Sequence, residues 1–206
     1  MKKINLGSGP VKGENGWINI DQLQGADLNI DITQGLPFPN DSIDIIYTSH
    51  FLEHLNYEVL CRVLKECQRV LSPGCPLSVC VPDASKFIRA YMQNDYQDVP
   101  YEKDRSLKVP SFLLEENEGV YKKAIVDTGS AIDWINYIAY SNAEHKYMFD
   151  INNLLAHLKI AGFMDVASRN FDPELDKYHG RNASIYAIGY KCSSATLNSG
   201  NKDVVF

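Results

Sequence analysis

Short apolar runs that end in turns recur through the first 83 residues, and their spacing constrains the fold more than any other feature of the chain. The runs that favour strands, rich in β-branched and aromatic residues, cover residues 3–6, 17–20, 28–32, 43–48 and 77–81. Between residues 50 and 71 the apolar positions recur every three or four residues, which predicts one or two amphipathic helices. The sequence therefore predicts an α/β fold, with a mostly parallel sheet covered by helices on both faces.

A different pattern occupies residues 84–149, where aromatic and charged residues follow one another without a single period. Helical spacing is present only at residues 84–92 and at about 130–141. We interpret the stretch as an insertion that caps the sheet, because the predicted sheet does not need it.

After the insertion the sequence returns to regular elements. Asp150 is a favourable N-cap for a helix over residues 151–161, and Gly162 is a favourable residue to end it. Residues 164–169 and 184–190 then favour two final strands.

The last segment, residues 193–206, is polar and predicts a disordered tail. The remaining residues, 1–192, are enough for one α/β domain and few for two, so we predict a single domain.

Charge and composition exclude several classes of protein. A net charge of −6 argues against a nucleic-acid-binding protein, which would carry a basic surface. No apolar run approaches the roughly 18 residues of a membrane span, and the apolar core of a signal peptide is missing. The five cysteines include no C-x-x-C pair, which is typical of reduced thiols. We therefore expect a cytoplasmic protein that acts on a small molecule; a homodimer stays open.

The turn Gly7-Ser8-Gly9 follows the first predicted strand but lacks the third glycine of a dinucleotide fingerprint. By itself it is equally consistent with a tight turn after an edge strand. Asp21 strengthens the ligand hypothesis, because it ends the next strand, where a carboxylate can accept both hydroxyls of a ribose.

Asp31 ends the third predicted strand beside the apolar Ile32, a position that suits an adenine ring. The connection between residues 9 and 17 is too short for a full crossover helix, whose N-terminus a pyrophosphate would require. S-adenosylmethionine carries no phosphate and needs only the close backbone approach that glycine permits. The pattern therefore favours S-adenosylmethionine over a nicotinamide cofactor.

Several runs match the motifs of one family in order and spacing. They are Asn5–Gly9 (NLGSG), Gly16–Asp21 (GWINID), Leu36–Tyr47 (LPFPNDSIDIIY), His50–Leu55 (HFLEHL) and Arg69–Gly74 (RVLSPG). Over about residues 3–83 the sequence thus resembles the small class I S-adenosylmethionine-dependent methyltransferases, similar to methyltransferase type 11. The resemblance implies a Rossmann-like, seven-stranded sheet with an antiparallel last strand. The helical and aromatic insertion, residues 84–149, precedes the final helix.

The resemblance also implies how the cofactor is held. The glycine loop would line the methionine part, Asp21 the ribose, and Asp31 with Ile32 the adenine, while the residues after the fourth strand would face the sulfonium. The cofactor-binding residues are then Gly7, Ser8, Gly9, Asp21, Asp31, Ile32, Ser49 and His50.

Three positions depart from the family's pattern. Asn5 stands where an acidic residue is common, Pro10 replaces a glycine, and Cys75 replaces the second glycine of a P-G-G turn. These departures keep open a second hypothesis, a cofactor-binding module without catalytic activity.

A third hypothesis comes from the run His50-Phe51-Leu52-Glu53-His54, which also matches the inverted zinc-protease motif H-x-x-E-H. Residues at i and i+4 share a helix face, so His50 and His54 could hold a metal beside Glu53 in a hydrolase or in a methyltransferase. The plain alternative is that His54 hydrogen-bonds a backbone carbonyl. No third ligand is marked by the sequence, so we predict no metal site.

Methyl transfer is an in-line displacement at an activated sulfonium, so alignment and exclusion of water matter most. An oxygen or nitrogen acceptor also benefits from a base, and the candidates are His50, His54 and His145. We expect the aromatic insertion, residues 84–149, to form the acceptor pocket. Similarity to methyltransferases of glycan pathways suggests a sugar of surface-polysaccharide biosynthesis as acceptor; the sequence alone does not identify the acceptor or the atom methylated.

Overall fold

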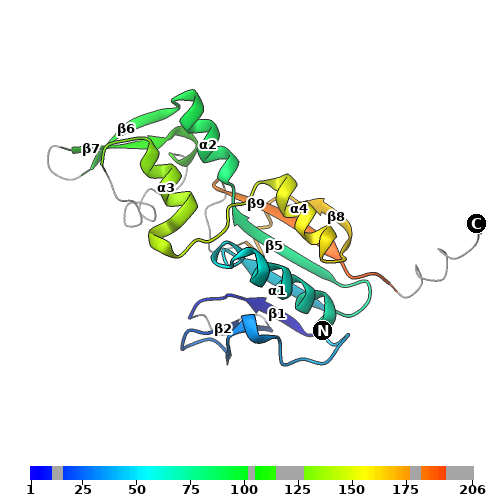
Figure 1. Cartoon of the computed structure of the whole chain (residues 1–206). Helices are drawn as coiled ribbons and strands as arrows, with labels where there is room; N and C mark the ends of the chain where they lie inside the picture. Colours follow the sequence, from blue (N-terminus) through cyan, green and yellow to red (C-terminus); the bar gives the residue numbers. More distant parts are fainter. Residues whose placement is uncertain (11–15, 102–104, 115–127, 177–181, 194–206) are drawn as a thin grey trace, which may run out of the picture.

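The computed structural model describes residues 1–10, 16–101, 105–114, 128–176 and 182–193, and its centre is a seven-stranded sheet in the order β3-β2-β1-β4-β5-β9-β8 (Figure 1). The strands of this sheet are β1 (Lys3–Leu6), β2 (Trp17–Asp21), β3 (Leu28–Asn29), β4 (Ile45–Ser49), β5 (Pro76–Pro82), β8 (Met164–Ser168) and β9 (Ser184–Tyr190). The first five strands are parallel, and β9 is antiparallel to both of its neighbours. The predicted mostly parallel sheet with an antiparallel last strand is confirmed.

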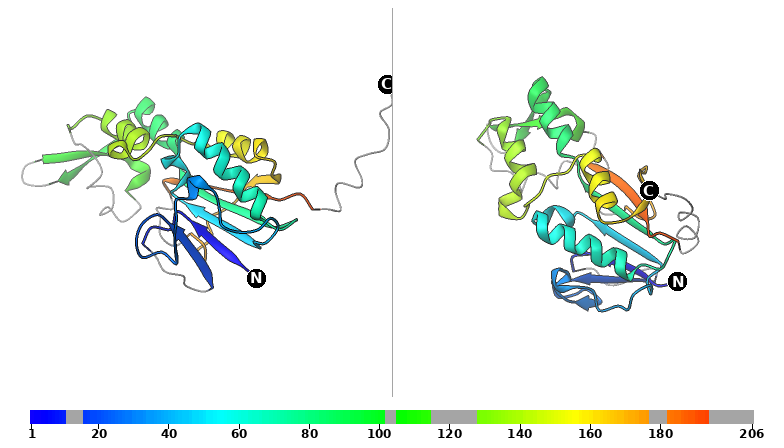
Figure 2. Two further views of the ribbon diagram at one scale, coloured as in Figure 1. Left: turned by 60° about the horizontal axis from the view of Figure 1, so that its bottom comes forward. Right: turned by 45° about the vertical axis from the view of Figure 1, so that its right-hand side comes forward.

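The helices and the remaining strands follow the sheet strands in the chain. The α-helices are α1 (Tyr57–Val70), α2 (Ala84–Gln93), α3 (Ile132–Tyr140) and α4 (Ile151–Ile160). Short 3₁₀ helices are η1 (Ile32–Gln34), η2 (Leu52–His54), η3 (Ser111–Leu113) and η5 (Ser141–Ala143), and a hairpin is formed by β6 (Tyr96–Tyr101) and β7 (Arg105–Pro110). Helices α1 and α4 lie on the same face of the sheet (Figures 1 and 2).

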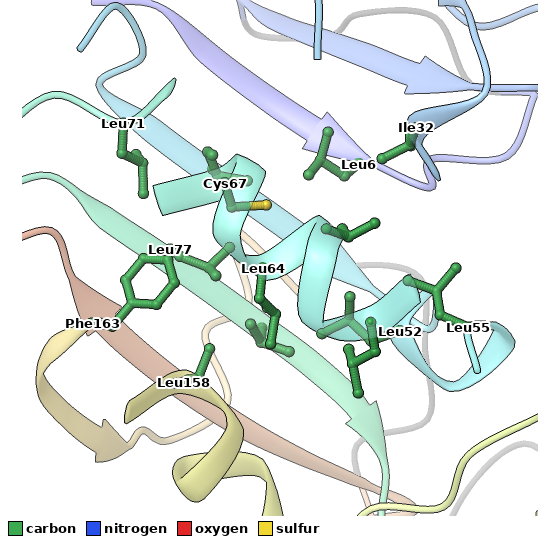
Figure 3. Close-up of a cluster of buried hydrophobic side chains, with 14 of the residues drawn as sticks. Leu6, Ile32, Leu52, Leu55, Leu64, Cys67, Leu71, Leu77, Leu158 and Phe163 are labelled. Carbon is green, nitrogen blue, oxygen red and sulfur yellow. The ribbon is translucent and has the colours of Figure 1, made fainter. Parts of the chain in front are cut away.

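The main hydrophobic core lies between the sheet and these two helices (Figure 3). Helix α1 begins where the Asn56 side chain accepts a hydrogen bond from the Val59 amide, and its buried residues recur every three or four positions. Leu64 and Cys67 from α1 lie against Leu77 of β5, and Leu158 of α4 lies beside them (Figure 3). The change from strand to helix periodicity after residue 50 therefore predicted a helix, α1, of the layer that covers this face of the sheet.

The opposite face of the sheet carries polar side chains in one register row, Asn19–Asn5–Tyr47–Ser78. An ion pair covers part of this row: Arg169 Nη1 lies 2.6 Å from Asp176 Oδ2, and Arg169 Nη2 lies 2.7 Å from Asp176 Oδ1. Tyr47 donates to the same carboxylate, and Arg169 Nε donates to Ser78 Oγ. A connection after β8 thus covers this face with a satisfied polar network.

Two local predictions need correction. The third strand ends at Asn29 rather than at residue 32, because the Asp31 side chain accepts the Thr33 amide and caps η1. Residue 50 does not begin a helix: the His50 backbone is left-handed, with φ +48°, and the helical turn starts at Leu52. The two predicted partners His50 and His54 therefore do not share a helix face.

The insertion forms a second hydrophobic cluster beyond the carboxyl ends of the parallel strands, built from α2, the β6–β7 hairpin and α3 (Figure 1). Phe87 of α2 is at its centre, with ring contacts to Phe112, Trp134 and Tyr137. The hairpin lies where the sequence showed no clear period. Parts of the predicted insertion (102–104 and 115–127) and of the predicted tail (194–206) lie outside the described residues.

Candidate cofactor pocket and active site

A cavity of about 630 Å³ opens at the carboxyl ends of β1, β2 and β4, within the size range of small-molecule sites. Open α/β sheets bind their ligands at this edge. The lining comprises Gly7, Gly9, Asp21, Gln22, Leu23, Ile30, Asp31, Ile32, Thr33, His50, Phe51, His54, Leu55, Ala143, Glu144 and Lys146. Most of the predicted cofactor residues thus line one cavity; Ser8 and Ser49 are not in its lining.

The glycine turn is shaped by the sheet below it and by Phe51 above it. The amides of Gly7 and Ser8 donate to the Ile20 carbonyl of β2, at 2.9 and 3.3 Å. Gly7 has φ +67°, and a Cβ at this position would lie 2.3 Å from Cγ of Phe51. Gly9 has φ +63°, and a Cβ there would meet no atom within 4 Å. The backbone at Gly9 is therefore open to a ligand.

Asp21, the last residue of β2, holds this turn in place. Its Oδ2 accepts the Gly9 amide at 2.9 Å and its Oδ1 accepts the Leu23 amide at 2.8 Å. Each carboxylate oxygen keeps further acceptor capacity, which suits the two hydroxyls of a ribose. The carboxylate thus links the glycine turn to the position expected for the ribose.

Asp31 and Ile32 lie further along the same edge. Hydrogen bonds from the hydroxyl and the amide of Thr33 hold the pKa of Asp31 below its usual value, so this carboxylate is ionised at neutral pH. Ile32 is buried in the main core. The pair therefore offers an acceptor next to an apolar surface, as recognition of an adenine requires.

His50 follows β4 directly, and its left-handed backbone turns its side chain into the cavity lining. Its Nε2 lies 2.9 Å from Ser184 Oγ and its Nδ1 lies 3.6 Å from Glu53 Oε1. A non-glycine residue in this backbone region is uncommon, and such residues concentrate at functional sites.

Glu53 and His54 occupy η2, one turn beyond His50. Glu53 is only 2% exposed, and burial raises the pKa of its carboxyl to about 8. His54 Nδ1 lies 3.1 Å from the Glu144 carbonyl, which can only accept, so Nδ1 carries the proton. His54 therefore donates a hydrogen bond to a backbone carbonyl, and its Nε2 lies 4.0 Å from Glu53 Oε1.

His145 reaches the same place from the end of the insertion. The amides of Lys146 and Tyr147 both donate to the Glu53 carbonyl, which fastens this segment to η2. The His145 ring stands edge-on to the His54 ring, with centroids 5.1 Å apart, and burial lowers its pKa. The structure thus brings together all three candidate histidines.

The large aromatic side chains of the described insertion do not line this cavity. Phe87, Phe112, Trp134 and Tyr137 pack on one another in the second cluster, whereas Tyr91 and Tyr140 are exposed. The contribution of the insertion to the cavity lining comes from Ala143, Glu144 and Lys146. No sequence pattern indicated Glu144 or Lys146 beyond their position on either side of His145.

Comparisons with known proteins agree with this site. The model of a family described as a methyltransferase domain matches residues 18–79, from β2 into β5. A comparison with curated protein sequences gives no significant match. The matched segment contains Asp21, Asp31, His50 and His54, and so includes residues of the cavity lining.

Solved structures share the fold at low sequence identity. A methyltransferase from Archaeoglobus fulgidus is 13% identical over 92% of this chain and 86% of its own, with a TM-score of 0.54. A possible histamine N-methyltransferase from Thermotoga maritima is 16% identical over 92% and 81%, with a TM-score of 0.51. Phosphoethanolamine N-methyltransferase 2 from Haemonchus contortus, in complex with S-adenosylmethionine, is 9% identical over 93% and 49%, with a TM-score of 0.51.

The methyltransferase-domain match over residues 18–79, the sheet order and the cavity at the strand ends agree with the fold of class I S-adenosylmethionine-dependent methyltransferases. Separately, none of the described helices has the length and apolar character needed to cross a membrane.

Proposed function

We propose that this chain is an S-adenosylmethionine-dependent methyltransferase that acts on a polar small molecule, with a sugar hydroxyl as the first candidate acceptor. The observation that carries the proposal is the character of the cavity at the end opposite Asp31. There the polar side chains His50, His54, Glu144 and Lys146 join the apolar residues Phe51, Leu55 and Ala143 in the lining, and they offer charge and hydrogen bonds to an acceptor. Such a lining matches an acceptor with several hydroxyl groups better than an aromatic one.

The same cavity supports a division into a cofactor half and an acceptor half. Gly9, Asp21 and Asp31 would hold the methionine, ribose and adenine parts, and the sulfonium would then lie near the carboxyl end of β4. In the transfer step the acceptor oxygen bonds to the methyl carbon as the carbon–sulfur bond breaks. The sulfur keeps the electron pair, which leaves S-adenosylhomocysteine, and the acceptor proton passes to a base.

His50 is the residue we assign to that base. It follows β4, lines the cavity, and has one ring nitrogen hydrogen-bonded to Ser184, which fixes the ring orientation. A positioned base of this kind contributes about 10²–10⁴-fold to a rate.

The test uses a methyl-labelled cofactor and a panel of sugars and sugar nucleotides, with product detected by mass spectrometry. We expect calorimetry to show binding of S-adenosylmethionine and no binding of a nicotinamide dinucleotide. His50→Ala should keep cofactor affinity within a few fold and lose turnover by about 100-fold or more. Transfer confined to apolar aromatic acceptors, or full turnover by His50→Ala, would refute the corresponding part of the proposal.

A further inference from the structure

Glu53, His54 and His145 form a cluster of potential metal ligands beside the acceptor end of the cavity. One ligand atom from each residue lies within 4.8 Å of the other two. Ligand atoms of a tetrahedral ion are roughly 3.3–3.6 Å apart, given metal–ligand distances of about 2.0–2.2 Å. Small rotations of these side chains would therefore bring the three atoms around one ion.

Both imidazoles already have the orientation of metal ligands. His54 Nδ1 donates to the Glu144 carbonyl at 3.1 Å, and His145 Nδ1 donates to the Ile138 carbonyl at 2.9 Å. A carbonyl accepts only, so these bonds place the proton on Nδ1 and leave a lone pair on each Nε2. Metal-binding histidines are held by such backbone acceptors, which fix the tautomer and the ring plane.

The Glu53 carboxyl supplies an independent sign that a ligand belongs here. Both of its oxygens are buried, and neither has a hydrogen-bond partner among the described residues. Its near neighbours are His50 Nδ1 at 3.6 Å and His54 Nε2 at 4.0 Å, which are beyond hydrogen-bond distance. Burying carboxyl oxygens that make no hydrogen bond is costly, and a bound metal ion would satisfy them.

We propose that Glu53, His54 and His145 bind a divalent first-row transition-metal ion such as zinc. Two imidazole nitrogens and one carboxylate oxygen suit these ions, whereas calcium and magnesium prefer oxygen ligands alone. Three protein ligands leave a coordination position open for a further oxygen.

His54 lines the cavity, so an ion bound by this cluster would lie beside the proposed acceptor end. There the ion would bind the acceptor hydroxyl and lower the pKa of that hydroxyl before methylation. This role rests on the proposed function, but the metal site itself does not.

The ligand set differs from that of the inverted zinc-protease motif. That motif would use His50 and His54, one helical turn apart, but His50 lies before η2 with a left-handed backbone. The residue that completes the cluster is His145, which the tertiary structure brings from the end of the insertion. The two alternatives therefore make opposite predictions for His50 and His145.

The experiment measures metal binding by the full chain without relying on turnover. Protein freed of metal with a chelator is titrated with Co²⁺ followed by visible absorption, and with Zn²⁺ by calorimetry. We expect one ion per chain and a cobalt spectrum without thiolate charge-transfer bands, which sets this site apart from the five cysteines. His145→Ala and Glu53→Gln should each lose affinity by at least about 10-fold.

His50→Ala is the matched control, because it removes a histidine beside Glu53 and should keep the full affinity for Co²⁺. Circular dichroism and binding of S-adenosylmethionine show whether each variant is folded. Wild-type protein that binds neither ion overturns the proposal, as does binding lost in His50→Ala and kept in folded His145→Ala. Cofactor binding without metal binding refutes the metal site alone; metal binding without cofactor binding refutes the proposed function alone.

Discussion

A Cβ atom on Gly7 would lie 2.3 Å from Cγ of Phe51. The Phe51 ring, in the segment after β4, therefore leaves room only for glycine at position 7, directly after β1. The two residues meet where the glycine turn and the segment after β4 both border the cofactor cavity. Because φ at Gly7 is +67°, an L side chain is disfavoured there even before the contact is counted. The packing of Phe51 therefore requires a glycine in this turn, and the same turn allows the ligand to approach the backbone closely.

Gly7→Ala should lower the melting temperature and abolish cofactor binding, because the new methyl group must displace Phe51. Gly9→Ala is the matched comparison: its φ of +63° carries a similar backbone cost of about 1–2 kcal/mol, but its Cβ meets no protein atom. We expect Gly9→Ala to remain folded and to lose affinity for S-adenosylmethionine. Thermal unfolding and calorimetry measure both effects; equal melting temperatures for the two variants would contradict the role of Phe51.

Asp21→Ala should weaken binding of S-adenosylmethionine by about 1–3 kcal/mol, because the ribose hydroxyls and the Gly9 amide lose their acceptor. Asp27→Ala is a suitable control. The Asp27 carboxylate also accepts an amide of β2, that of Asn19, but it does not line the cavity. Calorimetry measures the affinity of both variants for S-adenosylmethionine. Equal losses of affinity would show that Asp21 does not bind the cofactor.

Asp176→Ala should reduce the free energy of unfolding by about 3–5 kcal/mol, because it leaves the Arg169 guanidinium without its charge partner. The exposed ion pair of Lys108 with Asp98 offers the comparison. Removing Asp98 should change stability by roughly 0–1 kcal/mol, since solvent screens that pair. Urea unfolding monitored by circular dichroism gives both values; a small effect of Asp176→Ala would show that the polar face is not stabilised by this pair.

His157 should make the protein less stable in mild acid. Its Nε2 lies 3.0 Å from the Tyr147 hydroxyl, and burial lowers its pKa below the usual value of 6.5. Below pH 6.5 this histidine binds a proton more readily in the unfolded chain than in the folded chain. The free energy of unfolding is therefore unaffected above pH 6.5 and falls as the pH drops below 6.5. The rings of Tyr57 and Tyr147 pack against His157.

His157→Gln keeps a polar group near the Tyr147 hydroxyl and removes the titration. The difference in unfolding free energy between about pH 7 and about pH 5 should therefore shrink in this variant. Burial lowers the pKa of His145 as well, so part of the loss of stability in acid should persist in this variant. An unchanged difference in His157→Gln would show that this histidine does not contribute.

The local sequence determined much of the scaffold. Strand β1 spans the predicted residues 3–6, and α4 begins directly after its predicted cap, Asp150, whose side chain accepts the Asn153 amide. These features depend on residues a few positions apart, so periodicity and capping are enough to predict them. The proximity of the glycine turn to Asp21 could also be predicted from the sequence, because neighbouring parallel strands end at the same edge of the sheet.

Only the tertiary structure decided which distant residues meet. The sequence of the β6–β7 hairpin shows no clear alternation of apolar and polar residues. The hairpin packs against α2 and α3, and this packing does not follow from the local sequence. The contact of His54 with His145, and the ion pair that covers Tyr47, join segments that the sequence keeps far apart. Periodicity reports which face of an element is buried, whereas the order of the strands and the path of the insertion determine what it is buried against. For this reason the sequence could name each histidine as a candidate, but only the fold could place His145 beside Glu53.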